Sequence, residues 1–296
     1  MTSSNRVSTK LYIPHTSDPN CSIVGVLEQV SDTTVRDEAE SEKKIALILH
    51  GVGGHKDYLF LKRLALRLPM DSFRFDFRGN HETPGVWRQG ALAEDVVDVR
   101  VVVDYLKANY GYKVDLVVGH SRGSIVAFKW ICTTEEGRKI SGFVNASGRY
   151  RMPKILESPG VNVWQENIAK QGYHLWTATV ARKPFTAKIY REDLEAFTNW
   201  DTSFVWNQFP QSIDVLTIHG LSDPVVRPYD AIIYTRALGP RTPGTTNIHL
   251  MEDADHNFTG RQDEVVQAVL EWWDTKQHSN GSLKTGVWLS GIRGKL

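Results

Sequence analysis

The sequence predicts an α/β fold with a mostly parallel central sheet and helices on both faces. Apolar runs of strand length alternate with segments of helical periodicity along most of the 296 residues, which is the order that crossover units produce. The stretch DLVVGHSRGSIVAF passes from an apolar run through a glycine-flanked turn into a helical pattern. With 41% hydrophobic and 23% charged residues, the chain also has an ordinary globular composition.

The elements of the first half follow from their periodicity. KLYIPH and SIVGVLEQV predict two early strands that form a hairpin at the sheet edge, and IALILHG predicts a buried strand. DYLFLKRLALRL has helical spacing, and FRFDFRG alternates as a strand does. Apolar residues then recur every three or four positions, which places them on one helical face: Leu92, Val96, Val99, Val103 and Leu106.

The second half continues the alternation. KVDLVVGHS predicts a strand, SIVAFKWI a helix and ISGFVNASG another strand. DVLTIHG and TNIHLMEDADH predict two later strands, and DEVVQAVLEWWDT predicts the last helix. In a sheet of this kind the chemistry lies beyond the carboxyl ends of the strands.

Composition excludes several function classes. A formal net charge of +1 gives no indication of nucleic-acid or membrane-surface binding. The two cysteines, Cys21 and Cys132, are too few for a disulfide framework and predict free thiols in a reducing compartment. No segment reaches the roughly 18 apolar residues that span a bilayer, and the N-terminal residues lack an apolar signal core. We therefore expect a cytoplasmic protein with no nucleic-acid or membrane partner.

Ser121 is the candidate nucleophile. It lies in the pattern Gly119-His120-Ser121-Arg122-Gly123, at the junction between a predicted strand and a predicted helix. A sharp turn there strains the serine backbone and pushes its hydroxyl out of the sheet, and glycines on either side avoid clashes with neighbouring elements. A chance match to the pattern is the alternative, but the strand before it and the helix after it disfavour chance.

A serine nucleophile needs amide donors for the oxyanion, and the sequence HGVGGHKDY supplies a candidate loop. His50 and Gly51 close an apolar strand, and a glycine-rich turn follows. We expect the backbone amides of Val52 and Arg122 to be the donors. A phosphate-binding loop is excluded because the required glycine and lysine spacings are not met, and a flexible turn remains the structural alternative.

The orienting acid and the base are expected at the ends of later strands. Asp223 follows the strand run that ends at Gly220, whereas Asp214 begins that run and would lie at the wrong end of the sheet. His256 is the one histidine after Asp223 that lies where a strand gives way to a loop before the last helix. The resulting chain order, Ser–Asp–His, is a known order for a catalytic triad. His219 lies within a strand run and is expected to be a packed histidine.

Together these motifs resemble the α/β-hydrolase superfamily over roughly residues 20–275, through HGVGG, FDFRGN, GHSRG, HGLSDPVV and DADHNF in that order. Within it, the chain is similar to the esterase and serine-aminopeptidase-like branch, including cinnamoyl esterases. The resemblance implies Ser121, Asp223 and His256 as the triad, with amide donors at Val52 and Arg122. One departure is His81, at a position where that branch usually has glycine.

The resemblance also implies a division of the chain. Residues 1–148 and 211–276 are expected to form a discontinuous core, residues 149–210 a helical cap with no clear strand, and residues 277–296 a C-terminal tail. The cap is rich in aromatic residues, and aromatic side chains in a lid commonly line an apolar pocket. Trp176 and Trp206 are therefore candidate substrate-binding residues, although packing of the lid onto the core is the alternative for each.

The expected function is hydrolysis of carboxylic esters of small apolar or aromatic substrates through an acyl-enzyme. No cofactor is implied, and no metal, because no metal-ligand spacing occurs among the histidines and cysteines. A peptidase or amidase, an acyltransferase or a carbon–carbon bond hydrolase on the same triad, and a non-catalytic receptor on a hydrolase scaffold remain alternatives. The Arg122 side chain could form a salt bridge within the core loops or recognise a substrate carboxylate.

Overall fold

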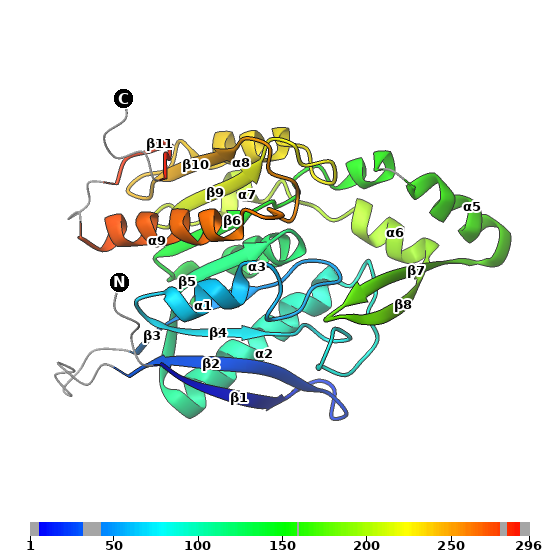
Figure 1. The fold of residues 1–296 in the computed structure, drawn as a ribbon, viewed down its shortest axis with the longest axis horizontal. Coiled ribbons are helices and arrows are strands. Elements are labelled where there is room, and N and C mark those ends of the chain that lie inside the picture. Colours follow the sequence, from blue (N-terminus) through cyan, green and yellow to red (C-terminus); the bar gives the residue numbers. More distant parts are fainter. Residues whose placement is uncertain (1–5, 32–42, 159, 279–282, 291–296) are drawn as a thin grey trace.

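The computed structural model describes residues 6–31, 43–158, 160–278 and 283–290 (Figure 1). Its strands are β1 (Arg6–Pro14), β2 (Ser22–Val30), β3 (Lys43–Leu49), β4 (Asp71–Phe75), β5 (Tyr112–His120), β6 (Gly142–Ala146), β7 (Tyr173–Val180), β8 (Lys183–Tyr190), β9 (Asp214–Gly220), β10 (Thr246–Met251) and β11 (Gly286–Val287). Its helices are α1 (Leu61–Arg67), α2 (Leu92–Tyr110), α3 (Arg122–Thr133), α4 (Glu135–Arg138), the 3₁₀ helix η1 (Met152–Glu157), α5 (Val161–Gln171), α6 (Arg191–Thr198), α7 (Val205–Gln208), α8 (Tyr229–Leu238) and α9 (Gln262–His278).

The described strands other than β7 and β8 form one sheet in the order β1-β2-β4-β3-β5-β6-β9-β10-β11. The pairs β1–β2 and β2–β4 are antiparallel, and every later neighbour pair is parallel. This confirms the predicted edge hairpin and the mostly parallel sheet. Within this sheet, β3, β4 and all strands later in the chain run in one direction. Their carboxyl ends therefore meet at one edge of the molecule.

Helices cover both faces of the sheet, and β3 shows why. Its residues Ile45, Leu47 and Leu49 pack into the core on the side of α2, α3 and α8. Ala46 and Ile48 pack on the opposite side, with α1 and α9 (Figure 1). Successive side chains of a strand point to opposite faces, so a strand buried on both sides reads as a continuous apolar run. The sequence IALIL is such a run.

The segment between β6 and β9 forms a cap that holds both helices and a hairpin, at the right of Figure 1. Strands β7 and β8 pair antiparallel from Tyr173 opposite Tyr190 to Val180 opposite Lys183. The expectation that this segment holds no strand is therefore wrong. The turn residues Ala181 and Arg182 have φ of 49° and 66°, and hairpin turns of that kind usually contain asparagine or glycine. Without either residue, the sequence carries no hairpin signal.

The residues predicted to form a separate C-terminal tail contribute to the core sheet. Helix α9 extends to His278, and β11 pairs with β10, with Gly286 opposite Asn247. The Asn247 side-chain amide donates to the carbonyl of Lys284 at 2.8 Å and accepts from the Trp272 indole at 3.1 Å. The division at residue 276 is thus wrong for this segment, while residues 279–282 and 291–296 of the predicted tail lie outside the described residues.

The two cysteines were predicted to be free thiols, and the structure agrees. Cys21 and Cys132 are both free and buried, and burial raises the pKa of the Cys132 thiol to about 12. That thiol is therefore protonated and unreactive at neutral pH. Among the helices of the described residues, none is both long and apolar enough to cross a bilayer.

Deletion of residues 283–296 should destabilise the whole sheet. The deletion removes the buried Leu283, which is 9% exposed, and leaves the Asn247 amide without its acceptor. We expect the free energy of unfolding to fall by about 2–4 kcal/mol, measured by urea denaturation against the full chain. An unchanged free energy of unfolding would mean that this segment is a dispensable tail.

Candidate active site

Ser121 occupies the sharp turn between β5 and α3, with φ 51° and ψ −114°. A residue other than glycine in such a conformation costs on the order of 1–3 kcal/mol. A Cβ added to Gly119 would lie 2.6 Å from the backbone nitrogen of Ser124, and one added to Gly123 would lie 2.6 Å from the carbonyl oxygen of Leu49. Side chains at these two positions would push α3 away from the sheet, so the close packing of the turn requires both glycines.

His256 lies in the loop between β10 and α9 and faces Ser121. Its Nε2 is 2.9 Å from Ser121 Oγ. The His256 backbone carbonyl accepts hydrogen bonds from His120 Nε2 at 2.9 Å and from Ser147 Oγ at 3.2 Å. Burial, reinforced by the nearby His256, lowers the pKa of His120 to about 3. His120 is therefore neutral at neutral pH, and with its proton on Nε2 it holds the loop that carries His256.

Asp223 follows β9 and faces the other side of the His256 ring. Its Oδ2 is 2.8 Å from His256 Nδ1, and its Oδ1 accepts the backbone N–H groups of Val225 and Val226 at 2.8 Å each. Burial alone would raise the pKa of Asp223, but hydrogen bonds from His219 and His256 outweigh it and hold that pKa well below its usual range. The carboxylate is therefore charged and fixed beside the imidazole.

His219 is a site residue whose contact with the acid sequence reasoning missed. It is fully buried, as expected of a packed histidine, but its Nε2 lies 2.8 Å from the carbonyl oxygen of Val226 and 3.2 Å from Asp223 Oδ2. A proton on Nε2 serves both acceptors. The signal available in the sequence was its position four residues before the acid, at the carboxyl end of the same strand.

The glycine-rich loop after β3 forms a tight turn beside Ser121. The Gly54 N–H donates to the Gly51 carbonyl at 3.1 Å, and Gly53 has φ 61°. No hydrogen bond among the described residues uses the backbone N–H of Val52 or of Arg122. Both residues line the same cavity as Ser121. Within the part of the chain that the structure describes, two backbone donors beside the serine thus have no protein acceptor.

The Arg122 side chain forms a salt bridge within the protein, which is one of the two roles that the sequence left open. Its Nε lies 2.5 Å from Asp95 Oδ2 on α2, and its Nη1 donates to the Gln89 carbonyl at 2.7 Å. Burial raises the pKa of Asp95 to about 6, against the opposing effect of the Arg122 charge. This pair fixes the start of α3 against α2.

A cavity of about 450 Å³ opens at Ser121, within the usual size range of small-molecule sites. Ser121 and His256 line it together with residues of the cap. Trp176 of β7 stacks on Trp87 at a ring-centroid distance of 4.9 Å and forms part of the wall. The apolar lining comprises Val52, Ile125, Ile155, Val161, Trp164, Trp176, Phe197, Pro224, Val225 and Val226.

Trp206, the second candidate substrate-binding tryptophan, is not among the residues that line this cavity. It lies on the short helix α7, is 43% exposed, and donates its indole N–H to the Tyr150 hydroxyl at 2.7 Å. Helix α7 packs against α3 and α8 of the core. Of the two tryptophans, Trp176 lines the cavity and Trp206 does not, and contact of Trp176 with a substrate stays a prediction.

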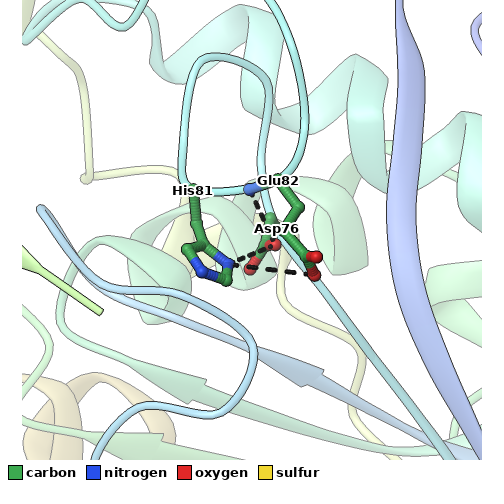
Figure 2. A group of neighbouring side chains, drawn as sticks. All are labelled: Asp76, His81 and Glu82. Carbon is green, nitrogen blue, oxygen red and sulfur yellow. Dashed lines mark hydrogen bonds and ion pairs between the residues drawn. The ribbon is translucent and has the colours of Figure 1, made fainter. Parts of the chain in front are cut away.

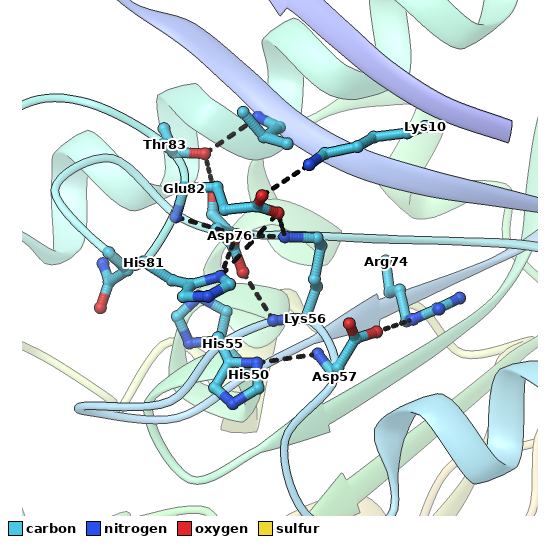
Figure 3. A network of polar contacts seen from close by, with 12 residues as sticks. Lys10, His50, His55, Lys56, Asp57, Arg74, Asp76, His81, Glu82 and Thr83 are labelled. Carbon is cyan, nitrogen blue, oxygen red and sulfur yellow. Dashed lines mark hydrogen bonds and ion pairs between the residues drawn. The ribbon is translucent and has the colours of Figure 1, made fainter. Parts of the chain in front are cut away.

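A buried ion pair fixes the backbone just after the glycine-rich loop. The Lys56 side chain, 2% exposed, donates to Asp76 Oδ2 at 2.6 Å and also to Glu82, and the Lys56 backbone N–H donates to Asp76 Oδ1 at 2.7 Å (Figure 3). Lys10 reaches Glu82 from β1 at 2.5 Å. Hydrogen bonds from Lys10 and Lys56 lower the pKa of Glu82 to about 2. Removing one partner of such a buried pair is strongly destabilising.

His81, the departure from the family pattern, lies in the same network. It has φ 46°, a conformation that favours glycine, and its Nδ1 is 3.2 Å from Asp76 Oδ2. Figure 2 shows His81, Asp76 and Glu82 converging, with one ligand atom from each within 4.8 Å of the others. Lys56 pairs with both carboxylates and Lys10 pairs with Glu82. Two ammonium groups thus offset the two negative charges, so this cluster is a poor candidate for a metal site.

Known proteins resemble this chain in sequence and in fold. Over 247 aligned residues the chain is 28% identical to the uncharacterized Saccharomyces cerevisiae protein YDL057W, covering 74% of this chain and 70% of that protein. The structure is similar to Est1E from Butyrivibrio proteoclasticus with ferulic acid bound (TM-score 0.70, 16% identity, 91% of this chain and 100% of that one). It is also similar to the Pyrococcus furiosus esterase Pf2001 (TM-score 0.62, 18% identity, 92% and 91%). The sequence profile of the alpha/beta hydrolase family matches residues 46–268, and the chain belongs to that family.

Proposed function

We propose that this protein is a serine hydrolase that cleaves carboxylic esters, with Ser121, His256 and Asp223 as its catalytic triad. The main support for this proposal is the hydrogen bonding among these three side chains. An unbroken line of hydrogen bonds runs from Asp223 Oδ2 through His256, 2.8 Å away, to Ser121 Oγ, 2.9 Å from the ring, and it ends at a cavity that can hold a small molecule. A nucleophile, a base and an orienting acid within hydrogen-bond reach are what acyl transfer requires.

In the first half of the reaction, Ser121 Oγ attacks the ester carbonyl while His256 Nε2 takes the hydroxyl proton. The carbonyl oxygen becomes an oxyanion, and the backbone N–H groups of Val52 and Arg122 stabilise it. Collapse of the tetrahedral intermediate breaks the bond to the alcohol oxygen. His256 returns its proton to the leaving alcohol, and the acyl group stays on Ser121.

In the second half, a water molecule gives its proton to His256 Nε2 and attacks the acyl carbonyl. Collapse of the second intermediate releases the carboxylic acid, and His256 returns the proton to Ser121 Oγ. Throughout, Asp223 holds the proton of His256 on Nδ1 and stabilises the imidazolium. Its second oxygen is held by two backbone amides, so the carboxylate cannot rotate away from the ring.

An apolar or aromatic acyl group fits the cavity. Trp164, Trp176 and Phe197 line it beside Ser121, and burial of apolar area favours binding by about 25 cal/mol per Å². The similar protein Est1E has been solved with ferulic acid, an aromatic acid, bound to it. That likeness supports an aryl or short-chain ester as the substrate class here.

Asp223→Asn should keep the fold and lower kcat on p-nitrophenyl butanoate by on the order of 10⁴-fold, because the imidazole loses its correct tautomer. Asp214→Asn is the matched control. Asp214 lies at the opposite end of β9 and pairs with Lys276 at 2.5 Å, so its loss should leave kcat within about threefold of wild type. The measurement is steady-state kinetics with thermal unfolding as the test of folding. A large loss in the Asp214 variant, with the Asp223 variant near wild type, would contradict the assignment.

The wild-type enzyme should also turn over the p-nitrophenyl ester faster than the matched p-nitroanilide. A phenoxide leaves without prior protonation more easily than an aniline nitrogen does. Equal or greater turnover of the anilide would identify a peptidase or amidase on the same triad.

Trp176→Ala should change the acyl preference, whereas Trp206→Ala should not. Truncating Trp176 removes about 50 Å² of apolar wall from the cavity, which corresponds to a loss of roughly tenfold in kcat/KM. We expect that loss for p-nitrophenyl cinnamate relative to p-nitrophenyl acetate. The measurement is the ratio of kcat/KM for the cinnamate to that for the acetate, in wild type and in both variants. An equal ratio in Trp176→Ala and wild type would mean that Trp176 only packs the cap.

A further inference from the structure

Arg149 is a buried cation in the wall of the active-site cavity. It lies just after β6, where the chain leaves the core for the cap, and it is 5% exposed. Its Nη2 donates to the carbonyl oxygen of Val225 at 2.7 Å. That is the only hydrogen bond its guanidinium makes within the described residues. A guanidinium carries five N–H donors, so most of its hydrogen-bonding capacity has no protein partner.

The other buried arginines of the described residues have ion-pair partners or several hydrogen-bond acceptors. Arg74 pairs with Glu28 at 2.7 Å and with Asp57 at 2.8 Å, and Arg122 pairs with Asp95. Arg241 donates to several backbone carbonyls and one hydroxyl. Arg149 has no carboxylate within 4.0 Å in the part of the chain that the structure describes. Burying a charge without a partner is costly, and such a cost persists at sites that serve function.

The acids nearest to Arg149 are already engaged. Asp230 Oδ1 accepts the backbone N–H groups of Tyr150 and Arg151, and its Oδ2 pairs with the Arg151 guanidinium at 2.9 Å. Asp223 is held by His256, His219 and two amides. Burial lowers the pKa of Arg149, and the charges of Asp230 and Asp223 oppose that shift. Its ordinary pKa is so high that the group stays protonated.

The surroundings of Arg149 favour an anion. Arg149 also lines a smaller pocket of about 140 Å³ that adjoins the main cavity through Ser158, Pro224 and Val225. The charged lining of this pocket is Arg149, Arg151, Lys154, Arg227, Glu157 and Asp230. Lys154 pairs with Glu157, and Arg151 pairs with Asp230. Arg149 and Arg227 are left without an acidic partner among the described residues.

We propose that the ester substrate carries a second, carboxylate group, which pairs with Arg149 while the ester carbonyl lies at Ser121. This inference rests on the proposed function and narrows its substrate class to esters with a remote carboxylate. The planar guanidinium fork matches a carboxylate, and the pair would supply the counter-charge that Arg149 lacks among the described residues. A neutral substrate of equal size would leave the cation buried and unpaired, so it would be selected against.

The test compares esters that differ only in charge. The acyl-side pair is p-nitrophenyl para-carboxybenzoate and p-nitrophenyl para-carbamoylbenzoate, and the alcohol-side pair is para-carboxyphenyl butanoate and para-carbamoylphenyl butanoate. The readout is the ratio of kcat/KM for the carboxylate to that for the carbamoyl ester. For wild type we expect a ratio of at least about tenfold in one pair, since a charge-assisted pair of hydrogen bonds contributes that much or more.

Arg149→Met should bring that ratio close to one, and Arg149→Lys should retain part of it. Arg236→Met is the matched control, because Arg236 is exposed on α8 and lines neither pocket. It makes the same change in net charge and should keep the wild-type ratio. If thermal unfolding shows that Arg149→Met does not fold, the ratio in Arg149→Lys is decisive, with a drop of about threefold or more expected. A wild-type ratio near one in both pairs, or a ratio unchanged in the Arg149 variants, would overturn the inference.

A binding measurement separates this inference from the proposed function. Ser121→Ala is titrated by calorimetry with monomethyl terephthalate and with methyl para-carbamoylbenzoate, neither of which it should cleave. We expect tighter binding of the carboxylate, lost when Arg149→Met is added. Absence of turnover of every ester by wild type, with this binding preference intact, would refute the hydrolase and keep the anion site. Turnover of the neutral esters without any carboxylate preference would refute the anion site alone.

Discussion

The turn that carries Ser121 can form only because two backbones approach each other more closely than side chains allow. A Cβ on Gly123 would overlap the carbonyl oxygen of Leu49, and a Cβ on Gly51 would lie 2.9 Å from His120 Nδ1 and 3.1 Å from Ser121 Cβ. The end of β3 and the start of α3 therefore lie against each other. That contact places the backbone amides of the glycine-rich loop beside the strained serine, where we propose that the oxyanion forms.

The remaining groups come to the same place because parallel strands end at one edge. Asp223 follows β9 and His256 follows β10, which is the neighbouring strand. Burial of these groups is tolerated because their charges are met locally: Asp223 by two histidines and two amides, and Asp76 by Lys56. Arg149 is the exception within the described residues, because it lies at the cavity wall without an acidic partner. A negatively charged group on the substrate would supply that partner.

The sequence was sufficient wherever a residue type reports directly on backbone geometry or burial. Glycines at fixed spacing located the sharp turn at Ser121, and continuous apolar runs located the parallel strands that are buried on both faces. It was insufficient for the hairpin β7–β8, whose turn at Ala181 and Arg182 lacks asparagine and glycine. It also missed the contact of His219 with Asp223 and the unpaired state of Arg149. Both depend on which side chains meet in space, and strand periodicity carries no information about that.

If Ser121 is the nucleophile, it becomes acylated during turnover, and the acyl-enzyme can be trapped. The protein is mixed with excess p-nitrophenyl butanoate, quenched in acid within the first turnovers, digested and analysed by mass spectrometry. We expect one butanoyl group on the peptide that contains Ser121, together with a burst of nitrophenol of about one equivalent when deacylation is the slower step. An acyl group on a different residue, or substrate turnover with no covalent adduct and no burst across a series of esters of slower deacylation, would contradict it.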